Sequence, residues 1–531
     1  MASRGIVPRK IKGFRDIDPE INGLRWELIR AASAVYERYG FEHWDTPALE
    51  YADCLGKHLA DSGTPEEGIY SFRNPEKEPA LDSTGRELRD DRNNVILERH
   101  HLALRYDLTA PLARKYAEQL WANVRQGTSR SQAKPPLFRR YQFGPVFRFE
   151  AKLDPGRFRE FWQLDFDTVG VGDTGCDAEV CAVLCDALEA IGLPRGGYEV
   201  RVSNRKLNRG LFQRLGVAGD EKLEWSILRV IDKYDKLGIE GVAAELAGGR
   251  EDPESHAFIE GLHLETAIID PVLRFIESCT GLKNRGDVLS RLEAELADTP
   301  AGKEGLEELC EIHEVLTALG YAEDRVVFDP SIVRGLAYYT GPVFEAVSKH
   351  EYRDARGQVR RFGSICGGGR YDDLVERLLG IRVPATGASI GVDRLLELLV
   401  QLRGDTRTTG PVLVTVMDPS RKTDYQRIAA SLRQAGIPAE VYYGTQRSIA
   451  QQLSYADAKG CPIAILAGGD EFARGTVSVK NLRLGKTLSA QIVNREEWRA
   501  AKQAQIEVPY GEMVCTVAHM LGDPGSPAAK E

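Results

Sequence analysis

Arginines gather in one short part of the chain, between residues 125 and 160. This stretch holds nine basic and three acidic residues, a local balance of +6, whereas the formal charge of the whole chain is −9. Arg148, Arg157 and Arg159 flank a Pro-Gly loop between two aromatic-rich runs of alternating pattern. Arginine makes bidentate contacts with phosphate oxygens, and the nearby Phe161 can stack on a purine. The pattern indicates a phosphate site, with a solvated basic face on a β-ribbon as the alternative.

Three later segments also hold residues suited to anion or ligand chemistry. In RGLAYYTGPVFE, Arg334 precedes a Tyr-Tyr pair on an apolar strand, where a buried guanidinium needs an anion. In ICGGGRYDDL, three glycines permit close approach of backbone or ligand, although the pattern is neither a dinucleotide fingerprint nor a Walker A loop. In GASIGVDRLLELL, Arg394 stands at the start of a helix, a position that favours phosphate. Each segment alone is equally explained by a structural ion pair, close packing or an exposed helical arginine.

The elements that must position these residues follow from the hydrophobic pattern. A helix is predicted from Asp18 to Gly40, with Asp18 as its cap, and FEHWDTPALEY continues as an extended segment. The runs FRRYQFGPVFRFE and FREFWQLDFDTVG predict an antiparallel strand pair. Residues 176–191 and most of 200–325 have helical spacing, and strand patterns resume after residue 325.

The last part of the chain has a pattern of its own. RGDTRTTGP is typical of a linker, and after it strands and helices alternate, beginning with the strand PVLVTVM. The helix TDYQRIAASLRQAG is expected to be capped by Thr423 and to end at Gly436, and further strands include TVSVKN and TLSAQIV. This alternation predicts a separate α/β domain. The final residues, ending GDPGSPAAKE, are typical of a disordered tail.

Composition excludes several classes of protein. With 42% hydrophobic and 28% charged residues, the 531-residue chain is neither wholly disordered nor collagen-like, and its net charge argues against non-specific coating of DNA. Nine cysteines are too sparse for a disulfide framework, so we expect a reducing, cytoplasmic location. Cys181 and Cys185, one helical turn apart, are predicted to be core groups rather than metal ligands. The start of the chain lacks the pattern of a secretory signal, and no apolar run is long enough to span a membrane. The charged residues 74–95 predict an exposed loop.

In their order along the chain, these segments resemble the class II aminoacyl-tRNA synthetases. FEHWDTPALEY is similar to motif 1, FGPVFRFE with GRFREF to motif 2, and GASIGVDRLLELL to motif 3. RGLAYYTG and GGGRYDDL resemble the two signatures of the histidyl-tRNA synthetase family, and LRYDLTAP and QLDFD resemble its substrate-binding segments. The resemblance extends from about Ile11 to about Val493, which is nearly the whole chain.

The resemblance implies an α+β fold: an antiparallel sheet flanked by helices, a helical insertion, and a C-terminal α/β anticodon-binding domain. The expected boundaries are 1–195 for the first part of the catalytic core, 196–325 for the mostly helical insertion, 326–404 for the second part of the core, 405–508 for the anticodon-binding domain and 509–531 for the tail. It also implies a homodimer formed through motif 1, with no membrane association.

The implied activity is the activation of L-histidine by ATP, with Mg²⁺, followed by transfer of the histidine to tRNA(His). The residues implied to bind ATP are Arg148, Glu150, Arg157, Phe161 and Arg394. Arg148 and Arg334 would hold the α-phosphate from two sides, as catalytic groups. Arg157 and Arg394 would hold the outer phosphates. Glu150 would bind the adenine amino group, and Phe161 with Arg394 would enclose the ring. No metal ligand is assigned.

The resemblance also implies a histidine pocket. Its expected residues are Asp107, Thr109, Gln163, Asp167, Arg334, Tyr338 and Tyr339. Asp167 and Tyr339 match the positions that bind the imidazole, and Asp107, Thr109 and Gln163 match those around the α-amino group. Tyr338 lines the same pocket. Leaving such groups unpaired would penalise the wrong amino acid.

The sequence departs from the family pattern in three places. Position 337 is Ala where the family commonly has Asp, and the position of Asp107 is often Glu. The loop AKLDPGRF differs from the common bacterial form, so the usual recognition of the extra 5′ guanosine of tRNA(His) is not carried over. The alternatives are a non-catalytic histidine-binding paralogue, such as the regulatory subunit of ATP phosphoribosyltransferase, and a related synthetase for proline, threonine or glycine. The three arginines Arg148, Arg334 and Arg394 argue against the first, and the paired histidine signatures against the second.

Overall fold

The computed structural model describes most of the chain. The described residues are 7–55, 68–82, 86–125, 135–149, 156–253, 256–333, 339–353, 357, 359–403, 410–445, 448–484 and 504–522. The chain divides into two compact units, Met1–Gly404 and Asp405–Glu531, and each is described here by itself. No helix of the described residues is long and apolar enough to cross a membrane.

The first unit is built on an eight-stranded sheet with the order β1-β7-β8-β15-β14-β13-β9-β12. The strands in this order are Glu42–His43, Phe138–Phe147, Glu160–Val169, Ala385–Gly391, Val359–Arg370, Pro342–Arg353, Tyr198–Asn204 and Val326–Phe328. β1 and β12 pair in parallel at the two edges, and all other neighbours are antiparallel. The predicted strand pair is therefore confirmed as β7 and β8, and the antiparallel sheet lies at the centre of the unit.

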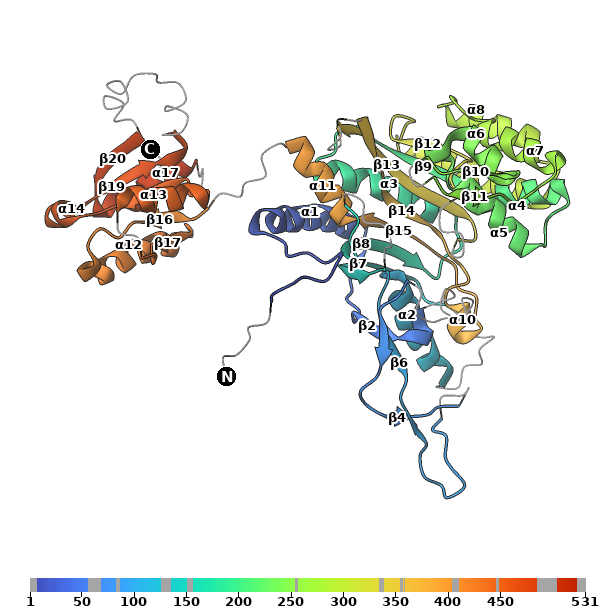
Figure 1. Cartoon of the computed structure of the whole chain (residues 1–531), viewed down its shortest axis with the longest axis horizontal. Helices are drawn as coiled ribbons and strands as arrows, with labels where there is room; N and C mark the ends of the chain where they lie inside the picture. Colours follow the sequence, from blue (N-terminus) through green and yellow to red (C-terminus); the bar gives the residue numbers. More distant parts are fainter. Residues whose placement is uncertain are drawn as a thin grey trace. The chain divides into compact units, whose positions relative to one another are not determined.

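Three helices pack on one face of this sheet: α1 (Pro19–Arg38), α3 (Gly175–Ile191) and α11 (Val392–Arg403). Figure 1 shows them together beside the strands. As predicted, Asp18 caps α1, because its carboxylate accepts a hydrogen bond of 2.9 Å from the Ile21 N–H. Cys181 and Cys185 are fully buried on α3 and belong to the main hydrophobic core, as the pattern predicted.

The region after β9 is helical and lies beyond one edge of the sheet (Figure 1). Its helices are α4 (Arg205–Leu215), α5 (Glu221–Ile231), α6 (Tyr234–Leu246), α7 (Thr266–Glu277), α8 (Arg285–Leu296) and α9 (Pro300–Ala318), with a short pair of strands, β10 (Gly249–Glu251) and β11 (Phe258–Glu260). One boundary was wrong. The expected insertion 196–325 includes β9, which pairs with β13 and β12 inside the main sheet. Tyr198, Val200 and Val202 alternate along β9 and are fully buried, which is why the segment forms a core strand.

A smaller sheet, β2-β6-β3, lies below the main sheet in the view of Figure 1. Its strands are Leu49–Tyr51, His101–Leu104 and Ser71–Arg73, and α2 (Thr109–Arg125) follows β6. Between β3 and β6 an arm extends away from the sheet, held by the short pair β4 (Glu78–Pro79) and β5 (Leu97–Glu98). The charged residues of this arm are exposed over most of its described length, as the sequence predicted.

The second unit has a five-stranded sheet in the order β17-β16-β18-β19-β20. Its strands are Ala439–Val441, Val412–Val414, Ile463–Leu466, Thr476–Asn481 and Gln505–Pro509, and its helices are α12 (Lys422–Gln434), α13 (Ile449–Ala458), α14 (Gly469–Arg474) and α17 (Met513–Leu521). α12 ends as predicted near Gly436, whose φ of 77° favours glycine. The predicted strand TLSAQIV lies outside the described residues.

Two predictions for this unit were wrong. Thr423 does not cap α12, which begins one residue earlier, after a 3₁₀ turn that Asp418 caps. The tail expected from residue 509 is instead ordered structure over residues 510–522, because Met513 and Val517 of α17 are fully buried in the core of this unit. This helix was missed in the sequence because its short amphipathic pattern, MVCTVAHML, is followed directly by Gly- and Pro-rich residues that are typical of a tail.

Candidate active site

Strand β8 presents a row of polar and aromatic side chains on one face of the sheet. Because side chains alternate along a strand, Gln163, Asp165 and Asp167 share a face, while Leu164 and Phe166 point into the hydrophobic core. Asp165 and Asp167 are only 1% and 2% exposed, which is unusual for carboxylates. Such burial requires partners, and these define the site.

Asp167 is held by two neighbours that the sequence did not assign to the site. The Arg140 guanidinium lies 3.0 Å from its Oδ2, and the Tyr371 hydroxyl donates a short hydrogen bond to its Oδ1. On β15, Gly387 leaves room for this carboxylate, since a Cβ there would lie 2.3 Å from Oδ1. Burial raises the pKa of Asp167, and the charge of Arg140 opposes that shift. Arg140 itself is 1% exposed and also donates to the Leu108 carbonyl at 2.8 Å.

Asp165 shares the same guanidinium. Burial raises the pKa of Asp165 to about 7; the Arg140 charge opposes the shift, and the Asp167 carboxylate adds to it. The Arg140 guanidinium therefore balances two buried carboxyl groups, which lie two residues apart on the same face of β8. Next to them, Gln163 donates from Nε2 to the Ser389 hydroxyl at 2.7 Å. Its buried Oε1 accepts no hydrogen bond from the described residues, so it can accept one from a ligand.

Asp107 and Tyr339 complete a polar pocket beside β8. Asp107 caps the first turn of α2, where its Oδ1 accepts from the Thr109 and Ala110 N–H groups at 3.1 and 2.8 Å. Burial raises the pKa of Tyr339, and the nearby charges of Asp167, Asp165 and Asp107 raise it further. The Tyr339 ring packs where a Cβ on Gly369 would lie 2.7 Å from its Cδ1. The structure thus brings Asp107, Gln163, Asp167 and Tyr339 together.

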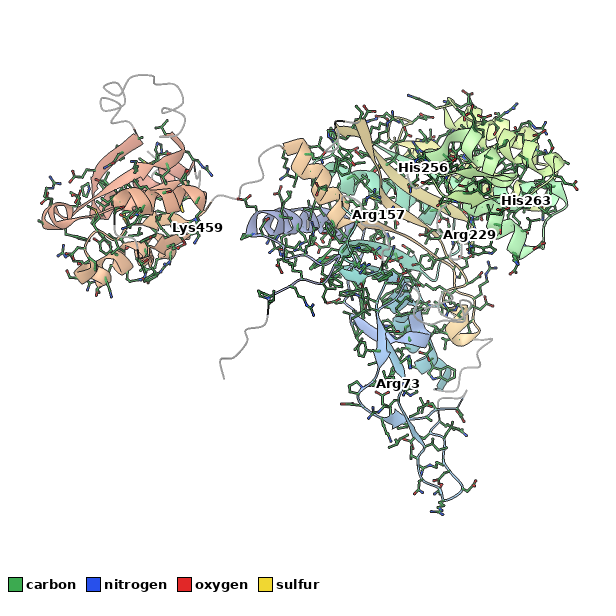
Figure 2. All side chains as sticks on the ribbon, viewed as in Figure 1. Arg73, Arg157, Arg229, His256, His263 and Lys459 are labelled. Carbon is green, nitrogen blue, oxygen red and sulfur yellow. The ribbon has the colours of Figure 1, made fainter. Side chains whose placement is uncertain are left out.

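Of the predicted phosphate-binding arginines, Arg148 lies near this pocket, where its charge acts on Tyr339. Arg148, half-buried, donates from Nε to the Tyr106 carbonyl at 2.8 Å, and its guanidinium carbon is 5.2 Å from the centre of the Phe161 ring. Arg394 donates to the Phe362 carbonyl at 3.1 Å. Gly156 packs against Arg394: a Cβ there would lie 3.5 Å from its Cα. Arg157 follows directly in the chain (Figure 2). Arg334, Tyr338 and Glu150 lie outside the described residues.

The comparisons with known proteins agree with this geometry. Residues 78–395 match the sequence model of the family described as histidyl-tRNA synthetase, and residues 412–509 match that of an anticodon binding domain. The chain belongs to the histidyl-tRNA synthetase family. The resemblance indicated by the motifs is confirmed, together with the fold class expected from it.

Relatives in this family are similar over nearly their whole length. A histidine–tRNA ligase of Paracoccus denitrificans is 46% identical over 513 residues, covering 96% of this chain and 97% of the relative. A histidine–tRNA ligase of Roseobacter denitrificans is 44% identical over 535 residues, covering 97% and 96%. The crystal structure of histidyl-tRNA synthetase from Nostoc aligns with a TM-score of 0.67 and 27% identity over 97% of this chain and all of that one. These relatives support an aminoacyl-tRNA synthetase over the regulatory paralogue.

Two further side chains join the three class II motifs of this family. Arg105, 3% exposed, donates to the Thr46 carbonyl at 2.6 Å and to the Pro145 carbonyl at 2.9 Å, so it ties motif 1 to β7. Asp393 of motif 3 accepts from the Trp162 N–H of β8 at 2.5 Å and pairs with Arg15. These contacts connect segments that are far apart in the sequence.

Sequence reasoning missed four of these groups: Arg105, Arg140, Tyr371 and Asp393. The sequence did contain a signal for Arg140, because this arginine occupies a buried position in the alternating run FRRYQFGPVF. A charge at an inward position of a strand requires a buried partner, and Asp165 and Asp167 on the next strand provide one. In GGGRYDDL, Gly368 packs against β15 and Gly369 against the Tyr339 ring, so these two glycines serve close packing.

Proposed function

We propose that this chain activates L-histidine with ATP in the pocket beside β8 and transfers it to the 3′ end of tRNA(His). One observation carries the proposal. Four of the five described residues implied to bind histidine, namely Asp107, Gln163, Asp167 and Tyr339, converge on one pocket beside Arg148, in a chain of the histidyl-tRNA synthetase family. ATP is the second substrate of this family's reaction.

Selection of histidine rests on the buried polar groups. Asp167 accepts the imidazole N–H, while Arg140 and Tyr371 hold its carboxylate in place. The Tyr339 hydroxyl contacts the other ring nitrogen. Gln163 Oε1, which accepts no hydrogen bond from the described residues, takes the α-amino group with Asp107. By the family resemblance, Thr109, Tyr338 and Arg334 would also bind histidine. An apolar amino acid would leave these groups unpaired, which costs several kcal/mol, about a factor of 10⁴ in discrimination.

Activation needs positioned cations more than a protein nucleophile. A carboxylate oxygen of histidine attacks the α-phosphorus of ATP, the bond from that phosphorus to the oxygen bridging to the β-phosphate breaks, and pyrophosphate leaves with that electron pair. Arg148 and Arg334 stabilise the charge on the α-phosphate oxygens. Arg157 and Arg394 bind the outer phosphates, and Glu150 binds the adenine amino group. Phe161 and Arg394 enclose the adenine ring.

Mg²⁺ is expected to accompany the nucleotide. Among the described residues, no group of three or more His, Cys, Asp or Glu side chains is arranged to hold a metal ion. The cation would therefore be coordinated mainly by the phosphate oxygens, as is usual for Mg²⁺ with ATP. It would neutralise phosphate charge, and the arginines of this chain do the positioning.

The tRNA is bound by more than one part of the chain. The domain matched over residues 412–509 binds the anticodon, and the helical insertion within 196–325 lies beside the pocket that receives the 3′ end. The catalytic core is formed by residues 1–204, which include β9, and by residues 326–404. All nine cysteines are free thiols, as is typical of a reducing compartment, and we place the protein in the cytoplasm.

A second copy of the chain covers the β2-β6-β3 sheet. Tyr51 and Phe72 both lie opposite Leu102 and share its face, and they are 40% and 46% exposed. The opposite face, with Glu50 and Ala103, is buried. Exposed apolar faces of this kind mark interfaces, and this one is continuous with the motif 1 segment. Sedimentation should show a dimer for the wild type and a monomer for Phe72→Glu; an unchanged dimer would place the interface elsewhere.

The reaction is tested by ATP–pyrophosphate exchange with each amino acid in turn. Histidine alone should support exchange. Exchange with no amino acid would exclude the enzyme and favour the regulatory paralogue. Exchange driven by threonine or proline would refute only the amino-acid assignment.

A further inference from the structure

The N-terminal segment of residues 12–15 lies along the end of the β7–β8 pair that leads toward the residues proposed to bind ATP. The Arg159 N–H donates to the Gly13 carbonyl at 2.8 Å, and the Arg148 N–H donates to the Arg159 carbonyl at 3.0 Å. Gly13 has a φ of 86°, and a Cβ there would lie 2.6 Å from Cγ of Arg159, so the close approach requires glycine. The segment therefore adds a third run of backbone beside Arg148.

Arg15, at the end of this segment, contacts motif 2 and motif 3 at once. Its guanidinium carbon lies 3.7 Å from the centre of the Phe158 ring, just before β8, and its Nη2 pairs with the Asp393 carboxylate in the first turn of α11. The Arg15 side chain is 26% exposed and that of Asp393 only 4%. An arginine can stack on a ring and donate to a carboxylate at the same time. Arg15 thus joins two motifs that lie far apart in the sequence.

The buried Asp393 carboxylate is held by Arg15 and by β8. Its second oxygen accepts from the Trp162 N–H at 2.5 Å. Arg25 of α1 also acts in this region: burial lowers the pKa of Arg25, the charge of Asp393 opposes that shift, and the charge of Arg15 adds to it. A buried carboxylate that loses a directly contacting cation is strongly destabilised. Without Arg15, we therefore expect Asp393 and the start of α11 to shift.

The groups that Arg15 contacts are neighbours of residues proposed to bind ATP. Asp393 directly precedes Arg394 in the chain, and Phe158 stands three residues before Phe161. Arg394 and Phe161 are the two groups proposed to enclose the adenine ring, so a shift of Asp393 or of Phe158 would move both sides of the nucleotide site. The histidine pocket is held by other contacts, because its carboxylates are balanced by Arg140 of β7.

We propose that Arg15 is a positioning residue for ATP, which holds both sides of the adenine site through Asp393 and Phe158. The proposal rests on the proposed function, which assigns the nucleotide to Arg394 and Phe161. Arg15 acts through its neighbours, because its guanidinium is already engaged by the carboxylate and the ring. A site that is fixed before its ligand arrives binds more tightly, since less freedom is lost on binding. A contact that served only to stabilise the fold would instead change the melting temperature and leave the KM for ATP unchanged.

The first test compares the two substrates of activation. In histidine-dependent ATP–pyrophosphate exchange, Arg15→Ala should raise KM for ATP by about tenfold, because misplaced binding groups weaken the site, whereas KM for histidine should change by less than about twofold. Equal rises of both KM values, or no rise of either, would overturn the proposal. Absence of exchange in the wild type would instead refute the proposed function.

Matched variants control for folding and charge. Arg15→Lys keeps a cation opposite the buried Asp393, so its melting temperature should stay near that of the wild type even if Arg15→Ala does not fold. Its KM for ATP should still rise, because lysine lacks the planar fork of arginine. Lys10→Ala removes an exposed cation close in the sequence, paired with the exposed Asp16, and should leave both KM values unchanged. If the Arg15 variants lowered the melting temperature but kept the wild-type KM for ATP, Arg15 would only stabilise the fold and the proposal would fail.

A double-mutant cycle tests whether Arg15 acts through Asp393. Asp393→Asn keeps an acceptor for the Trp162 N–H but loses the charge that pairs with Arg15. It should raise KM for ATP as Arg15→Ala does, and the two changes together should raise it little further than one alone. Calorimetric titration of each variant with ATP should rank the dissociation constants in the same order. Additive losses would show that Arg15 acts on the nucleotide by another route and would contradict the assignment.

Discussion

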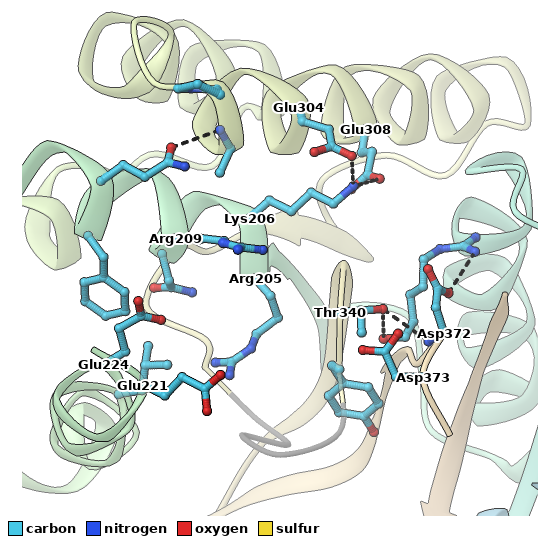
Figure 3. A pocket seen from close by; sticks show the side chains of 18 of the residues that line it. Arg205, Lys206, Arg209, Glu221, Glu224, Glu304, Glu308, Thr340, Asp372 and Asp373 are labelled. Carbon is cyan, nitrogen blue, oxygen red and sulfur yellow. Dashed lines mark hydrogen bonds and ion pairs between the residues drawn. The ribbon is translucent and has the colours of Figure 1, made fainter. Parts of the chain in front are cut away.

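The histidine pocket and the cleft under the helical insertion differ in the charge of their buried polar groups. In the pocket, the carboxylates of Asp165 and Asp167 are balanced by Arg140, and Asp167 also accepts from Tyr371. The cleft, of about 880 Å³, lies between helices α4, α5 and α9 and the residues that follow β14 (Figure 3), and its buried Asn208 amide is neutral. A pocket with buried charges can select a charged substrate, so substitutions there should change activation, whereas Asn208→Ala should not.

The largest expected effect concerns Arg148, which is proposed to bind the α-phosphate of ATP. Arg148→Ala should lower the rate of histidine-dependent ATP–pyrophosphate exchange by about a thousandfold, because a positioned donor to the transition state is lost. Arg361→Ala, which removes an exposed arginine paired with Glu351, is the control and should leave exchange unchanged. A near-normal rate for Arg148→Ala would show that this arginine does not act on the α-phosphate.

The next effect concerns the selection of histidine. Asp167→Asn should lower kcat/KM for histidine by about a hundredfold, mainly through KM, because a charged hydrogen bond to the imidazole is lost. Asp298→Asn, which changes an exposed carboxylate paired with Arg214 outside the family's signatures, is the control and should be neutral. If Asp167→Asn lowered kcat alone, Asp167 would contribute to chemistry rather than to selection.

The smallest effect is a pH dependence of stability. The pKa of Asp165 is raised to about 7, so between pH 4 and pH 7 the native state binds more protons than the unfolded state. The free energy of unfolding of the wild type should therefore fall as the pH rises through this range. Asp165→Asn lacks this titration. Between pH 5 and pH 8, the free energy of unfolding of this variant should therefore fall by about 2 kcal/mol less than that of the wild type. Equal losses in urea unfolding would show that Asp165 is already ionised at pH 5.

Local patterns predicted the framework of the fold well. The alternation around the Pro-Gly loop predicted the β7–β8 pair, and Asp18 with Pro19 predicted the start of α1. The terminal helix α17 was missed because one short amphipathic turn pattern is followed by residues typical of a tail. β9 was missed because its burial depends on β13, which lies far along the chain.

Only those residues of the candidate site that stand at motif positions were predicted from the sequence. Asp107, Gln163, Asp167 and Tyr339 follow from motif positions, and the structure brings them together. Arg140 reaches Asp167 from β7, and Tyr371 reaches it from the residue after β14, so no spacing along one segment encodes these contacts. Arg15 stands in none of the motifs, and only its contacts with Asp393 and Phe158 draw attention to it.

The central claim is that the sheet pocket selects histidine and that Arg15 positions ATP beside it. The most direct test measures KM for histidine and KM for ATP in ATP–pyrophosphate exchange, side by side in Asp167→Asn and Arg15→Ala. The account predicts that Asp167→Asn loses about a hundredfold in kcat/KM for histidine in exchange, and that Arg15→Ala keeps its KM for histidine while its KM for ATP rises about tenfold. The same ratio of the two KM changes in both variants would contradict this division.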